Sequence, residues 1–444
     1  MPVVSILMPS LNVVKYISEC MESVIRQTLK DIEIICIDAG STDGTFEKLV
    51  EYTEKDNRIR IIKSDRKSYG YQMNLGIDAA KGEYIGIVET DDYISEDMFE
   101  KLYKYVSENK ADFVKSRYIE FVGTDNKRRF RYAGNKFIES NNNKMIDLSK
   151  NSDFRLIDIN HIWSGLYQKD FLTENGIRFN ETPGASFQDT SFSILVGCLS
   201  KTCIYTTDSF YYYRMDNANS SVKQTTKVRC VVDEFKYIES ELKRRNIVDK
   251  NIESTIKKIK LGTYMWNYHR LTDEAKIEFM DIIKAEMSEL QEENCELMSD
   301  PVIKKQIDVL TKKELISEVN ETNNRIKNTM KKIADKCKKG SKFCIVGAGV
   351  YGKYMLDLQQ IFDLNFIEVF ADNSKELQGA FIDKYKILSI EDVLKQYRSI
   401  DWIIASKKYS LEIKKQLINL GISDESIFVM NATLEWPGLI NYFD

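Results

Sequence analysis

Acidic side chains gather where two apolar segments of the N-terminal part of the chain end. Asp38 closes the run IEIICID, and the run EYIGIV leads into ETDD, which holds Glu89, Asp91 and Asp92. Carboxylates at the end of a buried strand are costly unless a cation or a hydrogen-bond donor compensates their charge. Hard divalent cations bind oxygen, usually one or two carboxylates together with substrate phosphates. The pattern therefore favours a metal that bridges to a diphosphate. The alternative is a solvated turn that only caps the helix DMFEKLYKYV.

The segments around these acids alternate between strand and helix patterns from residue 1 to about 120. IEIICID is nearly continuous β-branched apolar sequence, as expected for a strand buried on both faces. Such alternation predicts an α/β fold with a parallel, doubly wound sheet. Sheets of this kind bind ligands beyond the carboxyl ends of their strands, which is where the acids fall.

The stretch from 223 to 339 is rich in Lys and Glu and almost free of glycine, which predicts a helical region. Part of it carries apolar residues at alternating spacings of three and four, which predicts one long helix with a heptad seam. This seam either pairs with a second copy of the chain, which would give a homodimer, or packs on its own chain. The seam consists of Val309, Ile316, Val319, Asn323, Ile326, Met330, Ile333 and Cys337.

An α/β pattern begins again near residue 340 with the strand KFCIVGAG. Gly347, Gly349 and Gly352 form G-x-G-x-x-G before the helix YGKYMLDLQQIF, and Asp372 ends the next strand. This spacing is close to that of a dinucleotide-binding turn and its ribose-binding acid. The segment is predicted to be a small Rossmann-like domain. Its glycines either bind a nucleotide or only permit tight packing of strand against helix.

Composition narrows the class of protein. The chain has 444 residues, 43% of them hydrophobic and 30% charged, which suggests a globular protein of about three domains, expected at 1–222, 223–339 and 340–444. A net charge of −4 argues against a nucleic-acid partner, whose binding depends on neutralising phosphates. The chain has only two histidines, which excludes a zinc site built from several His ligands.

Cysteine use and hydropathy suggest a compartment. The eight cysteines form no C-x-x-C pair, so a reducing environment is expected. No apolar run approaches the roughly 20 residues of a transmembrane helix. The first residues, MPVVSILMPSLN, lack the pattern of a signal peptide. We therefore expect a cytoplasmic protein, at most peripheral to the inner face of the membrane.

Ordered motifs through the first half of the chain resemble the family 2 glycosyltransferases of the GT-A fold. They are MPSLN, IDAGSTDGT, NLGIDAAKGEYIGIVETDD, WSGLYQKDFL, FQDTSF and YYYRMDNANSSV, and they span about residues 1–222. The segment from 340 onward is similar to small nucleotide-binding modules appended to bacterial polysaccharide enzymes. The resemblance implies a GT-A domain, a helical middle and a C-terminal Rossmann-like domain.

The resemblance also implies roles for single residues. Asp91 matches a ligand of Mg²⁺ or Mn²⁺, and Asp189 matches the general base of inverting members, although a helix N-cap is its alternative role. Arg214 could approach the diphosphate or the acceptor. The implied nucleotide-sugar site consists of Pro9, Asn12, Asp38, Asn74, Glu89, Asp91, Asp92 and Arg214.

Three positions depart from the family pattern. They bear on the identity of the donor more than on the class of reaction. Ala39 follows Asp38 where the family often has a second acid, Glu89 replaces an Asp, and Met73 stands where Arg is common. His161, just before WSGLY, could touch a phosphate or a metal, but a single His is more often structural.

The sequence therefore predicts a metal-dependent, inverting glycosyltransferase. Its expected donor is a nucleotide sugar, with UDP-linked sugars foremost. Its expected acceptor is a saccharide hydroxyl, lipid-linked or free, in a bacterial surface polysaccharide such as capsule or lipopolysaccharide. One alternative is an NAD(P)-dependent oxidoreductase centred on the C-terminal domain. Another is a non-catalytic scaffold with a degenerate first domain.

Overall fold

The computed structural model of the chain divides into two compact units. The first comprises Met1–Phe121 and Tyr132–Lys313, and the second comprises Val122–Arg131 and Glu314–Asp444. The two are considered separately below. The structure describes residues 1–124, 127–133, 136–150, 156, 161–185, 187–292, 296–397, 399–432, 434, 439 and 442.

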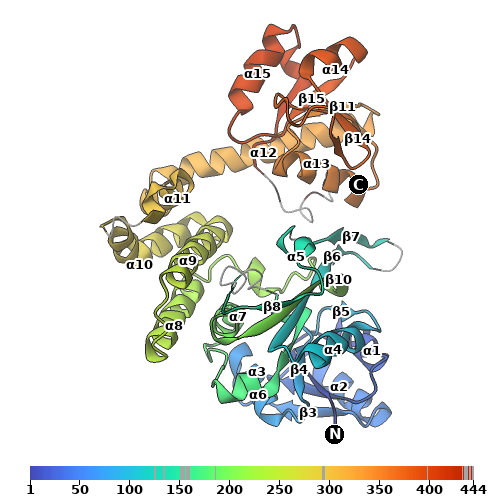
Figure 1. The fold of residues 1–444 in the computed structure, drawn as a ribbon, viewed down its shortest axis with the longest axis vertical. Helices are drawn as coiled ribbons and strands as arrows, with labels where there is room; N and C mark the ends of the chain where they lie inside the picture. Colours follow the sequence, from blue (N-terminus) through green and yellow to red (C-terminus); the bar gives the residue numbers. More distant parts are fainter. Residues whose placement is uncertain are drawn as a thin grey trace. The chain divides into compact units, whose positions relative to one another are not determined.

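The first unit is built on a sheet whose first four strands are parallel, as the sequence predicts. Their order is β3-β2-β1-β4. Every residue of β1 and β2 is buried. Right-handed crossovers place α1 and α2 on one side of these strands and α3 on the other (Figure 1). The bounds are β1 Val4–Ser10, α1 Ile17–Ile25, β2 Ile32–Asp38, α2 Thr45–Lys55, β3 Ile59–Lys63, α3 Tyr69–Ala79 and β4 Tyr84–Ile87.

The sheet as a whole is mixed, which corrects the expectation of a purely parallel one. Strand β9 (Gly165–Gln168) lies antiparallel between β4 and β6 (Phe113–Val122). Strand β10 (Thr202–Arg214) then runs parallel to β6 and antiparallel to the short β5 (Tyr93–Ile94). Because two antiparallel steps restore the direction, β10 points the same way as β1, β2 and β4. The carboxyl ends of these strands therefore meet at one edge.

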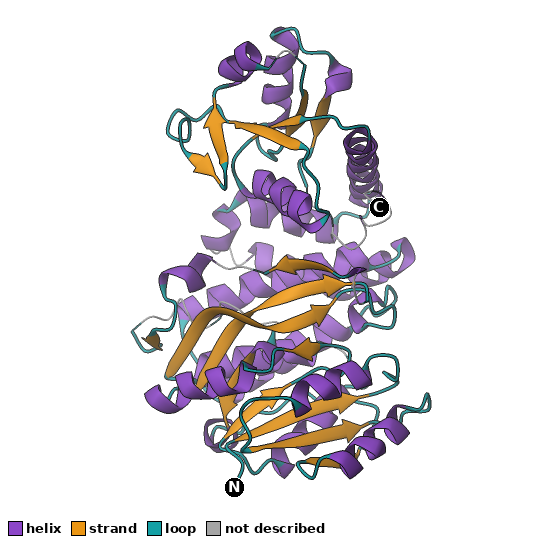
Figure 2. Ribbon diagram, turned by 90° about the vertical axis from the view of Figure 1, so that its right-hand side faces the viewer, coloured by secondary structure: helices purple, strands orange, loops and turns teal. Residues whose placement is uncertain are grey.

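Helices lie along both faces of this sheet (Figure 2). Helix α7 packs beside α8, and α8 beside α9, within the first unit. The bounds are α4 Met98–Asn109, β7 Arg129–Tyr132, α5 Lys136–Ser140, β8 Met145–Asp147, α6 Lys169–Glu174, α7 Gln188–Leu199, α8 Cys230–Arg244, α9 Lys250–Arg270, α10 Asp273–Glu292, α11 Pro301–Thr311 and α12 Leu315–Lys338.

The predicted long helix over the heptad seam is interrupted near its start: Val309 lies on α11, and the other seven seam residues lie on α12. Helix α11 ends at Thr311, Lys312 adopts an extended conformation, and α12 begins at Leu315. The break falls in the charged run KKE, where no apolar side chain gives the helix a surface to bury. Val309 thus lies on α11 of the first unit, whereas Ile326 is buried in the second, as are Met330 and Ile333.

The second unit holds a six-stranded sheet in the order β13-β14-β12-β11-β15-β16. All neighbours are parallel except β13 and β14. The core includes the fully buried Trp402 and Cys344. The bounds are β11 Phe343–Val346, α13 Val350–Ile361, β12 Ile367–Ala371, β13 Phe381–Ile382, β14 Tyr385–Leu388, α14 Ile390–Gln396, β15 Asp401–Ile404, α15 Ser410–Asn419 and β16 Ile427–Val429. None of the helices formed by the described residues combines the length and apolar character that crossing a membrane requires.

Candidate active site

The loop after β2 is organised around Asp38 at the carboxyl edge of the first sheet. The buried carboxylate of Asp38 accepts hydrogen bonds from the backbone N–H groups of Gly40 (2.9 Å) and Ser41 (3.0 Å) and from the Ser41 hydroxyl (2.5 Å). Asn12, after β1, donates its own N–H to the Ser41 hydroxyl (3.0 Å), and its side-chain oxygen accepts from Thr42 N–H (2.9 Å). Asn12 and Asp38 therefore belong to one hydrogen-bonded rim.

The segment ETDD begins just beyond β4 and is tied to strands β1 and β10. The Thr90 hydroxyl donates to the carbonyl of Pro9 on β1 (2.8 Å). Asp92 is 1% exposed, and its carboxylate accepts from the Tyr211 hydroxyl (2.8 Å) and the Arg214 N–H (2.7 Å), both on β10. Burial and the neighbouring Asp91 raise the pKa of Asp92 well above its usual value. Asp92 thus anchors the segment.

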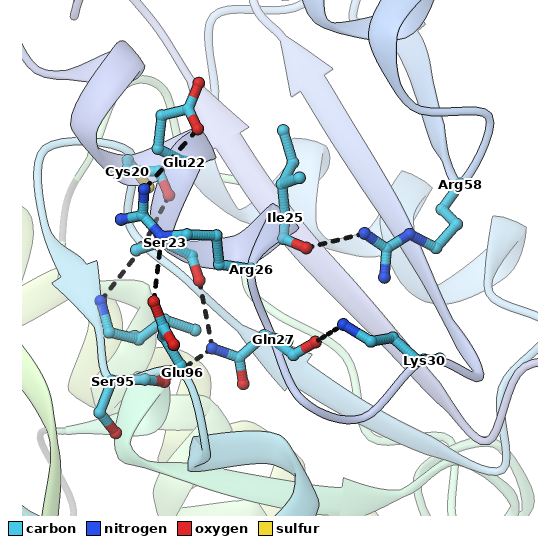
Figure 3. A network of polar contacts seen from close by, with 11 residues as sticks. Cys20, Glu22, Ser23, Ile25, Arg26, Gln27, Lys30, Arg58, Ser95 and Glu96 are labelled. Carbon is cyan, nitrogen blue, oxygen red and sulfur yellow. Dashed lines mark hydrogen bonds and ion pairs between the residues drawn. The ribbon is translucent and has the colours of Figure 1, made fainter.

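Helix α1 and Gln27, which follows it, hold the backbone after ETDD through a polar network (Figure 3). Gln27 Nε2 donates to the carbonyls of Ser23 (3.2 Å) and Ser95 (2.7 Å), and Ser23 Oγ accepts from Ile94 N–H (3.2 Å). The Ser23 hydroxyl also donates to the carbonyl of Cys20 (2.7 Å). With β10 on one side and α1 on the other, ETDD is fixed at both ends.

Glu89 and Asp91 are the partly exposed acids of ETDD. The Tyr69 hydroxyl donates to Glu89 Oε1 (2.6 Å), and Asn217 Nδ2 donates to Asp91 Oδ2 (2.7 Å). Desolvation, with the charges of Asp91 and Asp189, raises the pKa of Glu89 to about 8. Desolvation also raises the pKa of Asp91, against the lowering effect of Asn217 and Arg214. For both acids, desolvation outweighs the groups that lower the pKa, which include the Arg214 charge beside Asp91.

Arg214 lies beneath these acids. Its side chain is 3% exposed, and its guanidinium pairs with Glu19 (2.8 Å) and Asp216 (3.5 Å). Its Nε donates to the backbone carbonyl of Asp91 (2.8 Å), and Tyr16 covers one face at 4.7 Å. Arg214 therefore holds the backbone of Asp91. Its guanidinium is already paired with two carboxylates and covered by Tyr16.

Asp189 is the second residue of α7 and belongs to the same acidic group. Its Oδ1 accepts from Thr190 N–H (3.0 Å). Burial raises its pKa to about 6, whereas His161 and Lys115 lower it. Its charge contributes to the raised pKa of Glu89. The N-cap of α7 is Phe187, so Asp189 is not the helix cap.

Tyr213 of β10 interacts electrostatically with all four acids. Its pKa is raised by burial and by the charges of Asp92, Asp91, Glu89 and Asp189. Tyr213 is therefore within electrostatic range of all four carboxylates, which indicates that Asp91 and Asp189 lie on the same side of the unit. Behind Tyr213, Trp163 stacks on its ring at 5.2 Å, and Tyr118 contacts both Trp163 and His161.

Asn74 makes its hydrogen bonds to Phe179 and Glu181, which do not belong to this acidic group. Its amide donates to the carbonyl of Phe179 and to Glu181 (3.0 Å each) and accepts from Phe179 N–H (3.0 Å). These bonds clamp the segment after α6 onto α3. The residues that sequence reasoning missed are Tyr69, Asn217, Tyr211 and Tyr213. Asn217 could have been found from its place in the motif RMDNANSSV, but no pattern marks Tyr69.

The donor set fits a hard divalent cation. Among the described residues, no group of three or more His, Cys, Asp or Glu side chains is arranged to hold a metal ion. Asp91 and Glu89 nevertheless offer carboxylate oxygen, and their pKa values are raised chiefly by desolvation, which a bound cation would offset. Mg²⁺ and Mn²⁺ commonly take one or two protein carboxylates and complete their shells with phosphate and water.

The raised pKa of Glu89 predicts a pH-dependent stability. A carboxyl whose folded pKa lies above its unfolded value contributes most stability below about pH 4.5 and loses it as pH rises toward about 8. We expect the midpoint of thermal unfolding of the ligand-free protein to fall over that range and the fall to shrink in Glu89→Gln. The exposed Glu47→Gln should keep the wild-type slope. An unchanged slope in Glu89→Gln would contradict the assignment.

The carboxylate of Asp372 holds the glycine loop of the second unit through hydrogen bonds. Its Oδ2 accepts from Ala348 N–H (3.0 Å), and its Oδ1 accepts from Ser374 N–H (2.8 Å). Gly347 adopts φ +112, and a side chain at Gly352 would collide with the Gly347 carbonyl. A side chain at Gly349 would meet open space. Two of the three glycines are thus required by local packing, and the third is not.

Comparison with known families identifies two segments of the chain. The model of "Glycosyl transferase family 2" matches residues 5–172, and that of "C2185-like, N-terminal" matches residues 340–428. The glycosyltransferase GlyG of Streptococcus pneumoniae serotype 4 is 32% identical over 219 residues, which cover 48% of this chain and 70% of GlyG. GlyA of the same organism is 29% identical over 50% of this chain, but the match spans only 32% of GlyA.

Solved structures align with the chain at low identity. Staphylococcus aureus TarS 1-349 in complex with UDP-GlcNAc is 16% identical, with a TM-score of 0.43, over 64% of this chain and 85% of TarS 1-349. The mannosyltransferase PcManGT from Pyrobaculum calidifontis, in complex with GDP-Man and Mn²⁺, is 13% identical, with a TM-score of 0.42, over 71% of this chain and 88% of PcManGT.

Proposed function

This chain belongs to glycosyl transferase family 2, and from that premise we propose that its first unit transfers a sugar from a UDP-sugar to a saccharide hydroxyl with inversion at the anomeric carbon. The observation that carries the proposal is the electrostatic coupling of Glu89 to Asp91 and Asp189, and of Tyr213 to all three, where the strands end at the carboxyl edge of the sheet. Ligands of open α/β sheets bind at this edge.

The proposed donor site uses the rim of β1 and β2 together with ETDD. Asp38 and Asn12 would contact the nucleoside, since their loop lies where β2 ends and the backbone is already ordered by hydrogen bonds. Asp91, with Glu89 beside it, would hold Mg²⁺ or Mn²⁺. When bound, the metal supplies positive charge that stabilises the departing nucleoside diphosphate.

The proposed base is Asp189. An acceptor hydroxyl within about 3 Å of its carboxylate would pass its proton to Asp189 as the hydroxyl oxygen bonds to the anomeric carbon. The bond from that carbon to the diphosphate oxygen breaks, and its electron pair leaves with the diphosphate. A pKa of about 6 keeps Asp189 largely ionised at neutral pH and yet basic enough to take the proton.

Four residues of the predicted donor site receive narrower roles. Arg214 would act by holding the backbone of Asp91, because its guanidinium is paired with Glu19 and Asp216. Asn74 would act by fixing the segment that contains Phe179. Pro9 and Asp92 likewise would shape the floor of the site through ETDD rather than touch the donor.

The acceptor is proposed to be a growing surface polysaccharide. GlyG and GlyA are named only as glycosyltransferases, so this part rests on the resemblance to bacterial capsule and lipopolysaccharide enzymes. A lipid-linked acceptor would bring the enzyme to the cytoplasmic face of the membrane. A panel of nucleotide sugars, screened by metal-dependent release of the nucleoside diphosphate, tests the donor. Release from no member of the panel, with metal and acceptor oligosaccharides present, would contradict the proposal.

The second unit is proposed to be Rossmann-like and to bind a nucleotide. Its strand order changes direction between β11 and β15, beside the glycine loop, and such switch points bind ligands. Gly349→Val should abolish saturable binding of a nucleotide such as NADH or UDP while leaving the unfolding midpoint unchanged, because its side chain enters open space. The measurement uses the full chain carrying Asp91→Asn. Binding that survives Gly349→Val would leave the glycine loop a packing element only.

A further inference from the structure

Phe187, two residues before Asp189, adopts a backbone conformation that bulky side chains rarely take. It is the N-cap of α7 and has φ +66 and ψ +30, in the left-handed region. For a bulky residue this conformation is a genuine outlier. Such strain persists only where the surroundings over-determine the local structure, and it clusters at functional sites. The contacts of Phe187 therefore matter for the residue that follows it into the helix.

Two side chains of α9, Trp266 and Arg270, pack against the Phe187 ring. Trp266 meets it edge to face, with ring centroids 5.0 Å apart. The Arg270 guanidinium lies 5.2 Å from the Phe187 centroid and 5.0 Å from the Trp266 centroid. Arg270 is itself fixed, because Nε donates to Asn267 Oδ1 (3.0 Å) and a terminal nitrogen donates to the Lys227 carbonyl (3.0 Å). The Arg270 guanidinium is thus held in place against the Phe187 ring.

The segment before Phe187 is tied down from two sides as well. Lys227 Nζ donates to the Ala185 carbonyl (2.6 Å), and Gln188 Nε2 donates to the Gly184 carbonyl (3.0 Å). The same Gly184 carbonyl accepts from Tyr69 N–H (3.0 Å). The Tyr69 hydroxyl in turn holds Glu89 (2.6 Å). One short segment therefore joins the partner of Glu89 to the start of the helix that carries Asp189.

We propose that Trp266 and Arg270 are positioning residues for sugar transfer, which hold Phe187 and thereby aim the first turn of α7 so that the Asp189 carboxylate meets the acceptor hydroxyl. This inference rests on the proposed function, because it requires Asp189 to be the base. It assigns this role to two side chains of α9, Trp266 and Arg270, which act through Phe187. A displacement of about 1 Å at a reacting group can lower a rate by two orders of magnitude.

The test is a kinetic series on the full chain with an active donor and acceptor. Trp266→Ala should lower kcat by about tenfold or more, with the KM of the donor and the Kd of UDP changed by less than about twofold. Trp266→Phe, which keeps an aromatic edge, should retain most of the activity. Thr255→Ala, an exposed change on α9 far from Phe187 in sequence, is the matched control and should behave as wild type.

Two backgrounds separate positioning from a general loss of structure. In Asp189→Asn, Trp266→Ala should cause no further loss, because the group it positions is no longer a base. In Phe187→Gly, Trp266→Ala should also add little, since glycine takes positive φ freely and offers no ring to grip. An unchanged kcat in Trp266→Ala, or an equal loss in both backgrounds and in UDP affinity, would overturn the inference. Full turnover in Asp189→Asn alone would instead overturn the proposed function.

Discussion

Replacement of Asp189 by Asn is expected to lower the rate of sugar transfer by about 10²–10⁴-fold, the usual contribution of a general base. Asn has nearly the same shape but cannot take a proton at neutral pH. The donor should still bind, because the hydrogen bonds that order the loop of Asp38 and hold the Asp91 carboxylate come from other residues. Turnover and the Kd of UDP with metal, measured on the same preparation, check both halves of the expectation.

The pH profile of the wild-type enzyme gives a second readout of the same residue. Asp189 has to be ionised to act, so kcat/KM should climb as pH passes through about 6 and then level. The exposed Asp170 on α6 offers a matched control, and Asp170→Asn should keep both rate and profile. A loss of UDP affinity in Asp189→Asn as large as its loss of rate would contradict the assignment as base.

Replacement of Asp91 by Asn is expected to abolish metal-dependent binding of UDP and, with it, turnover. The carboxylate is the charge that a divalent cation needs, and loss of a ligand should weaken the metal complex by more than about 100-fold. The raised pKa of Asp91 indicates that its charge is poorly compensated in the free protein. Asn at this position removes that charge, so the ligand-free protein should be no less stable than wild type.

Calorimetric titration of UDP with and without Mn²⁺ measures this effect. Wild type should bind UDP much more tightly when Mn²⁺ is present, whereas Asp91→Asn should show the same weak affinity in both conditions. Asp170→Asn again serves as the control. If Asp91→Asn keeps the metal-dependent gain in affinity, then Asp91 is not a ligand, and Glu89 becomes the residue to test.

Much of the α/β architecture could be read from the sequence. Continuous apolar runs such as IEIICID mark strands buried on both faces, and the acids after them fall at the edge where parallel strands end. The antiparallel β9 could not be anticipated, because a strand's direction depends on pairing partners distant in the chain. The same limit applies to the heptad seam: spacing alone does not reveal that α11 ends at Thr311.

The candidate site was only partly accessible from motifs. Spacing placed Glu89 and Asp91 together, since both lie in ETDD, but it did not reveal that Arg214 would be paired with Glu19. Nor did it reveal that Asn74 would be occupied by Phe179. Side-chain partners of this kind come from tertiary packing. The Tyr69–Glu89 bond and the left-handed Phe187 are further examples, because both depend on elements folded against one another.

A structure of the full chain with UDP and Mn²⁺ bound tests the central claim most directly. The account predicts that Mn²⁺ binds the Asp91 carboxylate and the UDP phosphates. It also predicts that the uridine contacts the loop of Asp38 and that the Asp189 carboxylate faces the terminal phosphate. UDP found only at the glycine loop of the second unit, with no metal at Asp91, would contradict it.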